Sequence, residues 1–178
     1  MSAMARIGLL TGGGDAPGLN AVIRAVVKCA VNSGIECIGI EQGFDGMAAP
    51  GSTHCRALSP RDVTGILRVG GTILGASSRG NPFAQTGDGG AAAYEYASRV
   101  IEAFHRMRLD GLVAAGGDGT LAIAHEFSQR GIPIVGVPKT IDDDIAGTTS
   151  TCGFDTAVAF ATEAIDRLHT TAEAHRRI

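Results

Sequence analysis

The sequence has little net charge, few aromatic residues and no long apolar run. Its formal net charge is −3, tryptophan is absent, and aromatic residues make up 4% of the chain. A chain so close to neutral has no electrostatic basis for binding nucleic acid or an anionic membrane, so we expect neither partner. No apolar run reaches the roughly 20 residues that a membrane-spanning helix needs, and no signal peptide is visible, so we expect a cytoplasmic protein.

The cysteines lack the spacing of a metal or redox motif. None of Cys29, Cys37, Cys55 and Cys152 stands in a CxxC pair. Cys29 falls on a helix-like apolar pattern and Cys37 on a strand-like one. We therefore expect both to be buried thiols, as in a reducing compartment.

Glycine, in contrast, is abundant. The 26 glycines among 178 residues are about twice the usual share, and they gather at turns rather than in a repeat. A hydrophobic content of 44% is typical of a globular chain. Together these features favour ligand-binding loops on a folded domain over a low-complexity sequence.

Strand-like and helix-like segments alternate along the chain, which is typical of parallel βαβ units. The order predicts an α/β fold, a Rossmann-like three-layer sandwich with a mostly parallel sheet, and one domain spanning residues 1–178. In the first helix we expect Val22, Ala25, Val26, Cys29 and Ala30 to share the buried face. The expected strands are 6–10, 36–41, 72–74, 112–115 and 131–137, and the expected helices are 19–33, 59–70, 91–108, 120–129 and 153–174.

Two glycine-rich turns stand between an expected strand and an expected helix. The first follows residues 6–10 and contains Gly13 and Gly14; the second, residues 116–120, follows residues 112–115. Such turns let backbone N–H groups approach a phosphate at a helix N-terminus. The alternative is a pair of tight connections that need only a positive φ.

An acidic loop follows the last expected strand. Lys139 and Thr140 are followed by Ile141 and three consecutive carboxylates, Asp142, Asp143 and Asp144. Three adjacent carboxylates repel one another and solve no packing problem, whereas a metal, a phosphate and a hydroxyl would give each a role. Ligands of open α/β sheets bind at this end of the strands. The alternative is a solvated acidic turn with an aspartate as helix cap.

Five segments together resemble the 6-phosphofructokinase family over essentially the whole chain. They are GGGDAPGLN (12–20), GGTILG (70–75), GGDGT (116–120), PKTIDDD (138–144) and CGFDTA with EAIDRLHTTAEAHRR (152–177). The resemblance is to the N-terminal, donor-phosphate-binding half of a catalytic subunit about twice as long, so we expect the chain to be truncated and, as an alternative, to be an inactive phosphate-binding fragment. It implies Mg²⁺-dependent transfer of a phosphoryl group from ATP to the 1-hydroxyl of fructose 6-phosphate, in glycolysis.

The resemblance also implies roles for individual residues. Asp142 would be the general base on the sugar hydroxyl, with Thr140 bonding the transferring region and Asp144 nearby. Asp118 would be the Mg²⁺-associated carboxylate. The donor phosphates would be held by backbone N–H groups of Gly13, Gly14 and the turn formed by Gly117, Asp118, Gly119 and Thr120.

Two arginines complete the implied site. Arg79, in the long polar loop 77–90, resembles the arginine that bridges donor and acceptor phosphates, although one extra residue separates it from GGTILG. Arg177 resembles the arginine that reaches the sugar phosphate of a neighbouring subunit, which implies a homo-oligomer, a dimer or a tetramer. Arg24 and Lys28 stand where regulated members bind phosphate effectors; the alternative is a solvated helix face.

The phosphoryl donor is indicated by a mixture of residues. Lys139 stands where diphosphate-using members have lysine, whereas Gly119 stands where those members carry aspartate. Gly119 leaves room for the α-phosphate of ATP, and Phe44 can flank an adenine, although Ile123 is bulkier than the glycine often found there. We therefore favour ATP, with diphosphate as the alternative donor.

Other kinase and nucleotide-binding classes fit less well. GGDGT also occurs in the NAD kinase and diacylglycerol kinase group, but without the acidic loop that follows here. The first turn has Pro17 at the last glycine of the dinucleotide pattern GxGxxG, and Lys139 follows proline rather than the glycine of a Walker A motif.

Overall fold

The computed structural model describes residues 5–52, 54–77, 81–83 and 89–177, and its centre is one six-stranded sheet. The strand order is β3-β2-β1-β4-β5-β6; β3 is antiparallel to β2 and the other neighbours are parallel. The strands are β1 (Arg6–Thr11), β2 (Glu36–Ile40), β3 (Cys55–Leu58), β4 (Gly111–Gly116), β5 (Ile134–Thr140) and β6 (Cys152–Gly153). The α-helices are α1 (Leu19–Asn32), α2 (Phe44–Ala48), α3 (Gly89–Arg106), α4 (Asp118–Gln129) and α5 (Phe154–Ala174), and η1 (Pro50–Ser52) and η2 (Ile66–Arg68) are short 3₁₀ turns.

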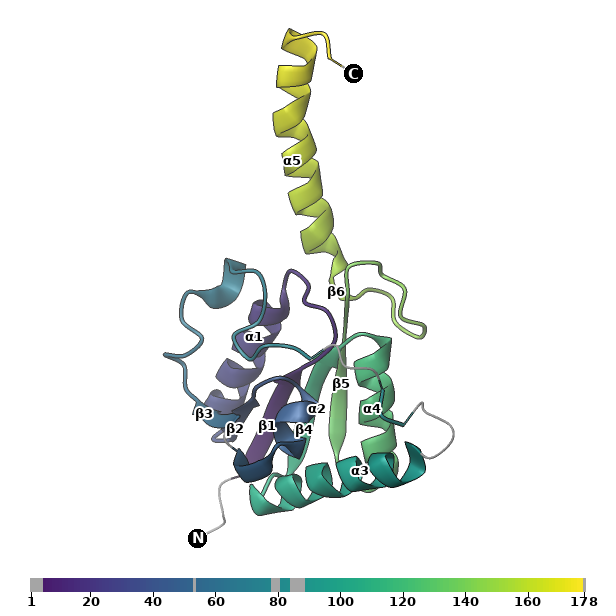
Figure 1. The fold of residues 1–178 in the computed structure, drawn as a ribbon. Helices are drawn as coiled ribbons and strands as arrows, with labels where there is room; N and C mark the ends of the chain where they lie inside the picture. The colour runs from purple at the N-terminus through teal and green to yellow at the C-terminus, as the bar shows by residue number, and fades with distance from the viewer. Residues whose placement is uncertain (1–4, 53, 78–80, 84–88, 178) are drawn as a thin grey trace.

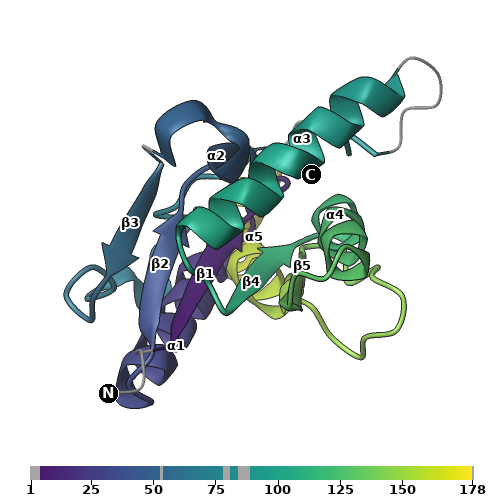
Figure 2. The same ribbon diagram turned by 90° about the horizontal axis from the view of Figure 1, so that it is seen from below.

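Helices cover both faces of the sheet and create two apolar cores. On one face, Ile23 and Val27 of α1 pack with Leu9 of β1. On the other face, α2, α3 and α4 bury a cluster that contains Phe44 and Phe127. Figure 2 shows α1 on one side of the sheet and α2 and α3 on the other. The predicted three-layer α/β sandwich with a mostly parallel sheet is confirmed.

The sheet reverses its winding direction at β1. This strand pairs with β2 on one side and with β4 on the other, and both neighbours run parallel to it. The connections that follow β1 and β4 therefore diverge to opposite faces of the sheet at the carboxyl ends of adjacent strands. Open α/β sheets bind their ligands in the crevice at such a switch point.

The segment between β3 and the loop at residue 75 differs from the prediction. The expected helix 59–70 is wrong: the Ser59 N–H and hydroxyl both donate to Asp62, and Gly65 has φ +79°, so only the 3₁₀ turn η2 forms. The expected strand 72–74 is a turn between Gly71 and Gly75, whose φ values are +71° and +64°. The antiparallel strand β3 lay just before this segment and was not predicted.

Two buried side chains hold that turn, residues 70–75, against β1 and α1. The fully buried Thr11 hydroxyl lies 2.9 Å from the hydroxyl of Thr72 and donates to the carbonyl of Gly75 over 2.7 Å. The amide of Asn20, on α1, donates to Val69 and Gly70 and accepts the N–H of Ile73. The turn is therefore fixed by long-range polar bonds that no strand or helix pattern encodes.

The buried face of α1 is rotated from the predicted one. Ile23, Val27 and Ala30 are buried, whereas Cys29 is exposed, so the expected burial of Cys29 is wrong. Because the predicted face lay one position away, only Ala30 was assigned correctly to the core. Cys37 is fully buried as expected, and burial raises the pKa of its thiol to about 11.

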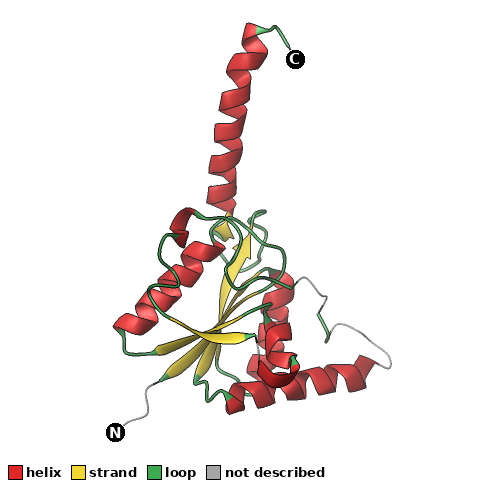
Figure 3. Cartoon of the chain, turned by 60° about the vertical axis from the view of Figure 1, so that its left-hand side comes forward, coloured by secondary structure: helices red, strands yellow, loops and turns green. Residues whose placement is uncertain are grey.

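Helix α5 leaves the body of the molecule. Its 21 residues include none that is buried, and Figures 1 and 3 show it projecting from the edge of the sheet beyond β6. Phe160, Ile165 and Leu168 are each more than half exposed along it. Among the described residues, no helix has the length and apolarity that crossing a membrane requires.

Candidate active site at the switch point

The two glycine turns meet at the carboxyl ends of β1 and β4. Thr11 pairs with Ala115 in the sheet, and the N–H of Gly12 donates to the carbonyl of Ala115 over 2.9 Å. β5 ends alongside, because Pro138 pairs with Gly116. The first turn, the second turn and the approach to the acidic loop therefore lie together, as the sequence predicts.

Thr120 is the side chain that fits the two turns together. It is buried on the first turn of α4, and its hydroxyl would lie 2.6 Å from a Cβ at Gly12 and 2.5 Å from one at Gly116. Both distances are below the closest that real Cβ atoms show. Gly12 and Gly116 are thus required by close packing, not by an unusual φ.

Helix α4 begins at this junction with no side-chain cap. Gly117 is the N-cap residue and makes no side-chain hydrogen bond, and Asp118 and Gly119 follow it in exposed positions. Backbone N–H groups at an uncapped helix start attract anions, phosphates in particular. A Cβ at Gly119 would meet no atom within 4 Å, so open space lies in front of this residue.

The first glycine turn is partly committed to bonds within the protein. Gly13 has φ +76°, and its N–H donates to the carbonyl of Ser77 over 3.0 Å. A phosphate bound by the Gly13 N–H would have to displace that carbonyl. Gly14 lines a separate shallow depression, together with Asp15 and Thr72.

Lys139 lies beneath this turn. It is buried near the end of β5, and its ammonium donates to the carbonyl of Gly14. Burial lowers the pKa of Lys139, and the nearby Asp15 carboxylate opposes that shift. The ammonium also lies 3.7 Å from a Cβ placed at Gly13, so its charge faces the surface where a phosphate would sit.

A pocket of about 210 Å³ opens above the two turns, lined by Gly12, Gly13, Gly119 and Thr120 at one side. Phe44, at the start of α2, forms an apolar wall; its ring packs against Phe127 with centroids 5.2 Å apart, so only part of it faces the pocket. Ile123, which the family resemblance places near the adenine of ATP, also lines this pocket.

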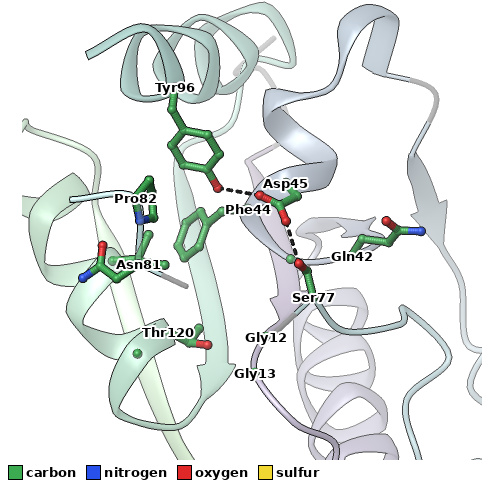
Figure 4. A pocket seen from close by; sticks show the side chains of 13 residues that line it. Gly12, Gly13, Gln42, Phe44, Asp45, Ser77, Asn81, Pro82, Tyr96 and Thr120 are labelled. Carbon is green, nitrogen blue, oxygen red and sulfur yellow. Dashed lines mark hydrogen bonds between the residues drawn. The ribbon is translucent and has the colours of Figure 1, made fainter. Parts of the chain in front are cut away.

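Five polar residues that line this pocket were not predicted, namely Gln42, Asp45, Ser77, Asn81 and Tyr96, and three of them are hydrogen-bonded to one another. The carboxylate of Asp45 accepts a hydrogen bond from the Ser77 hydroxyl over 2.6 Å and one from the Tyr96 hydroxyl over 3.1 Å (Figure 4). Tyr96 comes from α3, and Ser77 from the loop after residue 75.

The acidic loop starts later than predicted, because β5 continues through Pro138 and Lys139 to Thr140. The N–H of Asp142 donates to the Thr140 hydroxyl over 3.1 Å, and the Asp142 side chain is exposed. Asp143 has φ +53° and accepts both the N–H and the hydroxyl of Thr151, over 2.9 and 3.2 Å. Asp143 therefore shapes the loop, which leaves the carboxylates of Asp142 and Asp144 directed to solvent.

Of the two predicted arginines, only Arg177 can be placed, and it does not join this group. Arg79 lies outside the described residues. Arg177 is exposed beyond the far end of α5, with its N–H donating to the carbonyl of Ala172. A 21-residue helix is about 30 Å long, so Arg177 lies remote from Asp142 within one chain.

Within the described part of the chain, no three His, Cys, Asp or Glu side chains converge into a set that could hold a metal alone. Asp118 is an exposed carboxylate beside the uncapped start of α4. Mg²⁺ usually takes one or two carboxylates and completes its shell with substrate phosphates and water. The residues present therefore fit a Mg²⁺ that arrives with a bound phosphate.

Comparison with known proteins places the chain in a single family. The family model described as "Phosphofructokinase" matches residues 6–178. A protein of Chloroflexus aggregans named ATP-dependent 6-phosphofructokinase is 52% identical over 173 residues, which is 97% of this chain and 48% of that protein. A protein of Dictyoglomus thermophilum named pyrophosphate–fructose 6-phosphate 1-phosphotransferase is 47% identical over 97% of this chain and 46% of that protein.

A solved structure gives the same result. Phosphofructokinase from Saccharomyces cerevisiae superposes with a TM-score of 0.77 at 28% identity, covering 96% of this chain and 25% of that one. The chain spans about half the length of the curated relatives that it matches.

Proposed function

Since this chain belongs to the phosphofructokinase family, we propose that it carries the donor-binding part of a kinase. The reaction transfers the terminal phosphoryl group of ATP to the 1-hydroxyl of fructose 6-phosphate and gives fructose 1,6-bisphosphate, a step of glycolysis in the cytoplasm. The observation that carries this proposal is the meeting of both glycine turns with the end of β5 at the switch point.

Phosphoryl transfer needs a positioned nucleophile and compensation of phosphate charge more than covalent chemistry. The uncapped start of α4 supplies N–H groups for the donor phosphates, and the Lys139 ammonium faces them from below. Asp118 would hold Mg²⁺ together with those phosphates, and the ion would neutralise charge on the transferring group. Asp142 would accept the proton of the sugar hydroxyl, with Thr140 orienting its loop.

ATP is the donor that the pocket supports best. Gly119 lines the pocket and leaves open space where a larger side chain would project, and Phe44 offers an apolar wall to a base. Diphosphate is the second candidate, because Lys139 is buried directly under the first turn and a relative at 47% identity is named for pyrophosphate.

The proposed binding site for the phosphate of fructose 6-phosphate is not formed by the described residues of one chain. Arg177 lies remote from Asp142 along α5, so we propose that it serves a site formed with another chain in a homo-oligomer. Arg79 is proposed to bridge the two phosphates on the strength of the family resemblance alone.

The test is a coupled assay of the intact protein with fructose 6-phosphate, Mg²⁺ and either ATP or diphosphate. We expect ATP-dependent formation of fructose 1,6-bisphosphate that stops when the metal is chelated. Turnover with diphosphate and none with ATP would replace the donor, and no turnover with either would refute the proposal.

A further inference from the structure

The pocket contains a carboxylate that the proposed chemistry does not use. Asp45 lies on α2 immediately after Phe44 and lines the pocket with Ser77 and Tyr96. Its two oxygens are held separately, one by the Ser77 hydroxyl and the other by the Tyr96 hydroxyl. The side chain is thereby fixed by elements that are 32 and 51 residues away in the sequence.

Asp45 is separated from the part of the pocket that suits phosphates. In Figure 4, Asp45 and Tyr96 lie at the upper end of the view, Gly12, Gly13 and Thr120 lie at the lower end, and Phe44 lies between. A carboxylate repels a phosphate at close range, by roughly 4 kcal/mol at about 4 Å in a medium of effective dielectric near 20. A triphosphate therefore binds at the glycine end, and only an uncharged part of the donor is compatible with Asp45.

The free hydrogen-bonding capacity of Asp45 matches a pair of hydroxyl groups. An ionised carboxylate has about four acceptor positions and no donor. The hydroxyls of Ser77 and Tyr96 occupy one position on each oxygen, which leaves one on each oxygen for a ligand. A ribose presents two adjacent hydroxyl donors, and acidic side chains bind ribose hydroxyls in other α/β nucleotide sites.

We propose that Asp45 is a specificity-determining residue that accepts hydrogen bonds from the ribose hydroxyls of the nucleotide donor, with Tyr96 and Ser77 as the residues that position it. The inference rests on the proposed use of ATP and deepens it. In this arrangement the phosphates of ATP bind at the glycine turns, the adenine lies along Phe44, and the ribose hydroxyls donate to Asp45. Diphosphate has no sugar, so Asp45 contributes to selection of a nucleotide over diphosphate.

The experiment measures binding to the intact protein by calorimetry, with Mg²⁺ present and no sugar phosphate. The probes are ATP, 2′,3′-dideoxy-ATP, which lacks both ribose hydroxyls, and ITP, which lacks the exocyclic amine of adenine. The wild type should bind ATP at least about tenfold more tightly than dideoxy-ATP, the size of one hydrogen bond to a charged group. Asp45→Asn should weaken ATP binding by a similar factor and leave dideoxy-ATP unchanged.

Matched variants separate this role from a structural one. Asp62→Asn makes the same change at a carboxylate that also accepts a serine hydroxyl but is not among the residues that line the pocket, so all affinities should stay as in the wild type. Tyr96→Phe keeps the ring and removes one of the two bonds that position Asp45, so it should reduce the preference for ATP over dideoxy-ATP partially. If Asp45→Asn does not fold, this variant carries the test.

The outcomes are distinct. An equal loss for all three nucleotides in Asp45→Asn would assign Asp45 to packing and overturn the inference. Loss of the preference for ATP over ITP, with the dideoxy preference kept, would assign it to the base and also overturn it. An unchanged dideoxy preference in Tyr96→Phe would remove Tyr96 from the positioning role and, where Asp45→Asn does not fold, would overturn the inference. Failure of the wild type to bind any nucleotide would refute the ATP proposal itself.

Discussion

The chain up to the end of β5 and the chain after it are stabilised in different ways. In the first region three polar residues at the switch point, Thr11, Thr120 and Lys139, are all less than a tenth exposed. In the second region Asp142 and Asp144 are exposed, and α5 buries no residue. The glycine turns at the switch point are therefore organised by packing within this chain, whereas the acidic loop is held by a few local hydrogen bonds.

The largest effect is expected in the second region, at Asp142. Asp142→Asn should lower kcat by about 10²–10⁴-fold because the positioned base is lost. ATP affinity should hardly change, because Asp142 is not among the residues that line the nucleotide pocket. Steady-state kinetics and nucleotide titration of the intact protein test both parts. Near-normal turnover would remove Asp142 from the role of base.

The second prediction concerns Gly119 in the first region and the choice between ATP and diphosphate. Gly119→Asp should lower the ratio of kcat/KM for ATP to that for diphosphate by about a hundredfold to a thousandfold, because a like charge about 4 Å from the α-phosphate costs roughly 4 kcal/mol. Gly119→Ala is the control, since its Cβ meets no atom within 4 Å and adds no charge. An unchanged ratio in the aspartate variant would mean that Gly119 does not select the donor.

Gly116 and Gly119 lie in the same turn, but a side chain at Gly116 would meet closely packed atoms, whereas one at Gly119 would meet open space. Gly116→Ala should lower the free energy of unfolding by about 1–3 kcal/mol, because its Cβ would overlap the buried Thr120 side chain. Gly119→Ala should change it by much less. Chemical denaturation of the 178-residue chain compares the two, and equal stability would show that Thr120 can move away at little cost.

Asp143 tests whether local bonds shape the acidic loop. Asp143→Ala should lower the free energy of unfolding by about 1–2 kcal/mol, because it removes the acceptor of the buried Thr151 N–H, leaves the Thr151 hydroxyl with only the Thr140 carbonyl, and places alanine at φ +53°. Asp143→Asn keeps an acceptor oxygen and tolerates positive φ, so it should be close to the wild type. Thermal unfolding of both variants measures the difference, and a stable alanine variant would contradict the assignment.

The smallest effect is expected at Val158 on α5, and Val27 on α1 is its buried counterpart. Val27→Ala on α1 should cost about 2 kcal/mol, because the side chain is fully buried. Val158→Ala on α5 should change stability by less than about 0.5 kcal/mol, because the side chain is 47% exposed. Denaturation of the 178-residue chain tests both. A large loss at Val158 would mean that α5 is covered in solution.

Prediction from the sequence succeeded where the signal was local. The strand and helix alternation gave the sheet, and the positions of the two glycine turns after β1 and β4 brought Gly13 and Gly119 into the same pocket. Because β1, β4 and β5 are parallel neighbours, their carboxyl ends lie at the same edge of the sheet, which brings both turns next to the end of β5. The roles of Asp142, Asp118 and Arg177 stay predictions that the fold makes testable.

The failures have two causes, a local turn that replaced a predicted helix and long-range bonds that no local pattern encodes. A serine followed by proline predicted a helix at residue 59, but the Asp62 carboxylate and Gly65 turned the chain instead. The turn at residues 70–75 depends on Thr11 and Asn20, which lie 50 residues or more earlier. Asp45 was missed for the same reason, because its partners come from two other elements.

The hydrogen bonds from Thr11 and Asn20 to the turn at residues 70–75 lower the entropic cost of binding a ligand nearby. Ordering a loop during association opposes binding by roughly 0.5–1.5 kcal/mol for each side chain that becomes immobile. Here Thr11 and Asn20 already make these bonds in the free protein, and Ser77, which follows the turn, already holds the N–H of Gly13. The turn at residues 70–75 and the segment that leads from it to Ser77 are therefore ordered before any ligand binds, so binding at the first glycine turn would spend little free energy on ordering them.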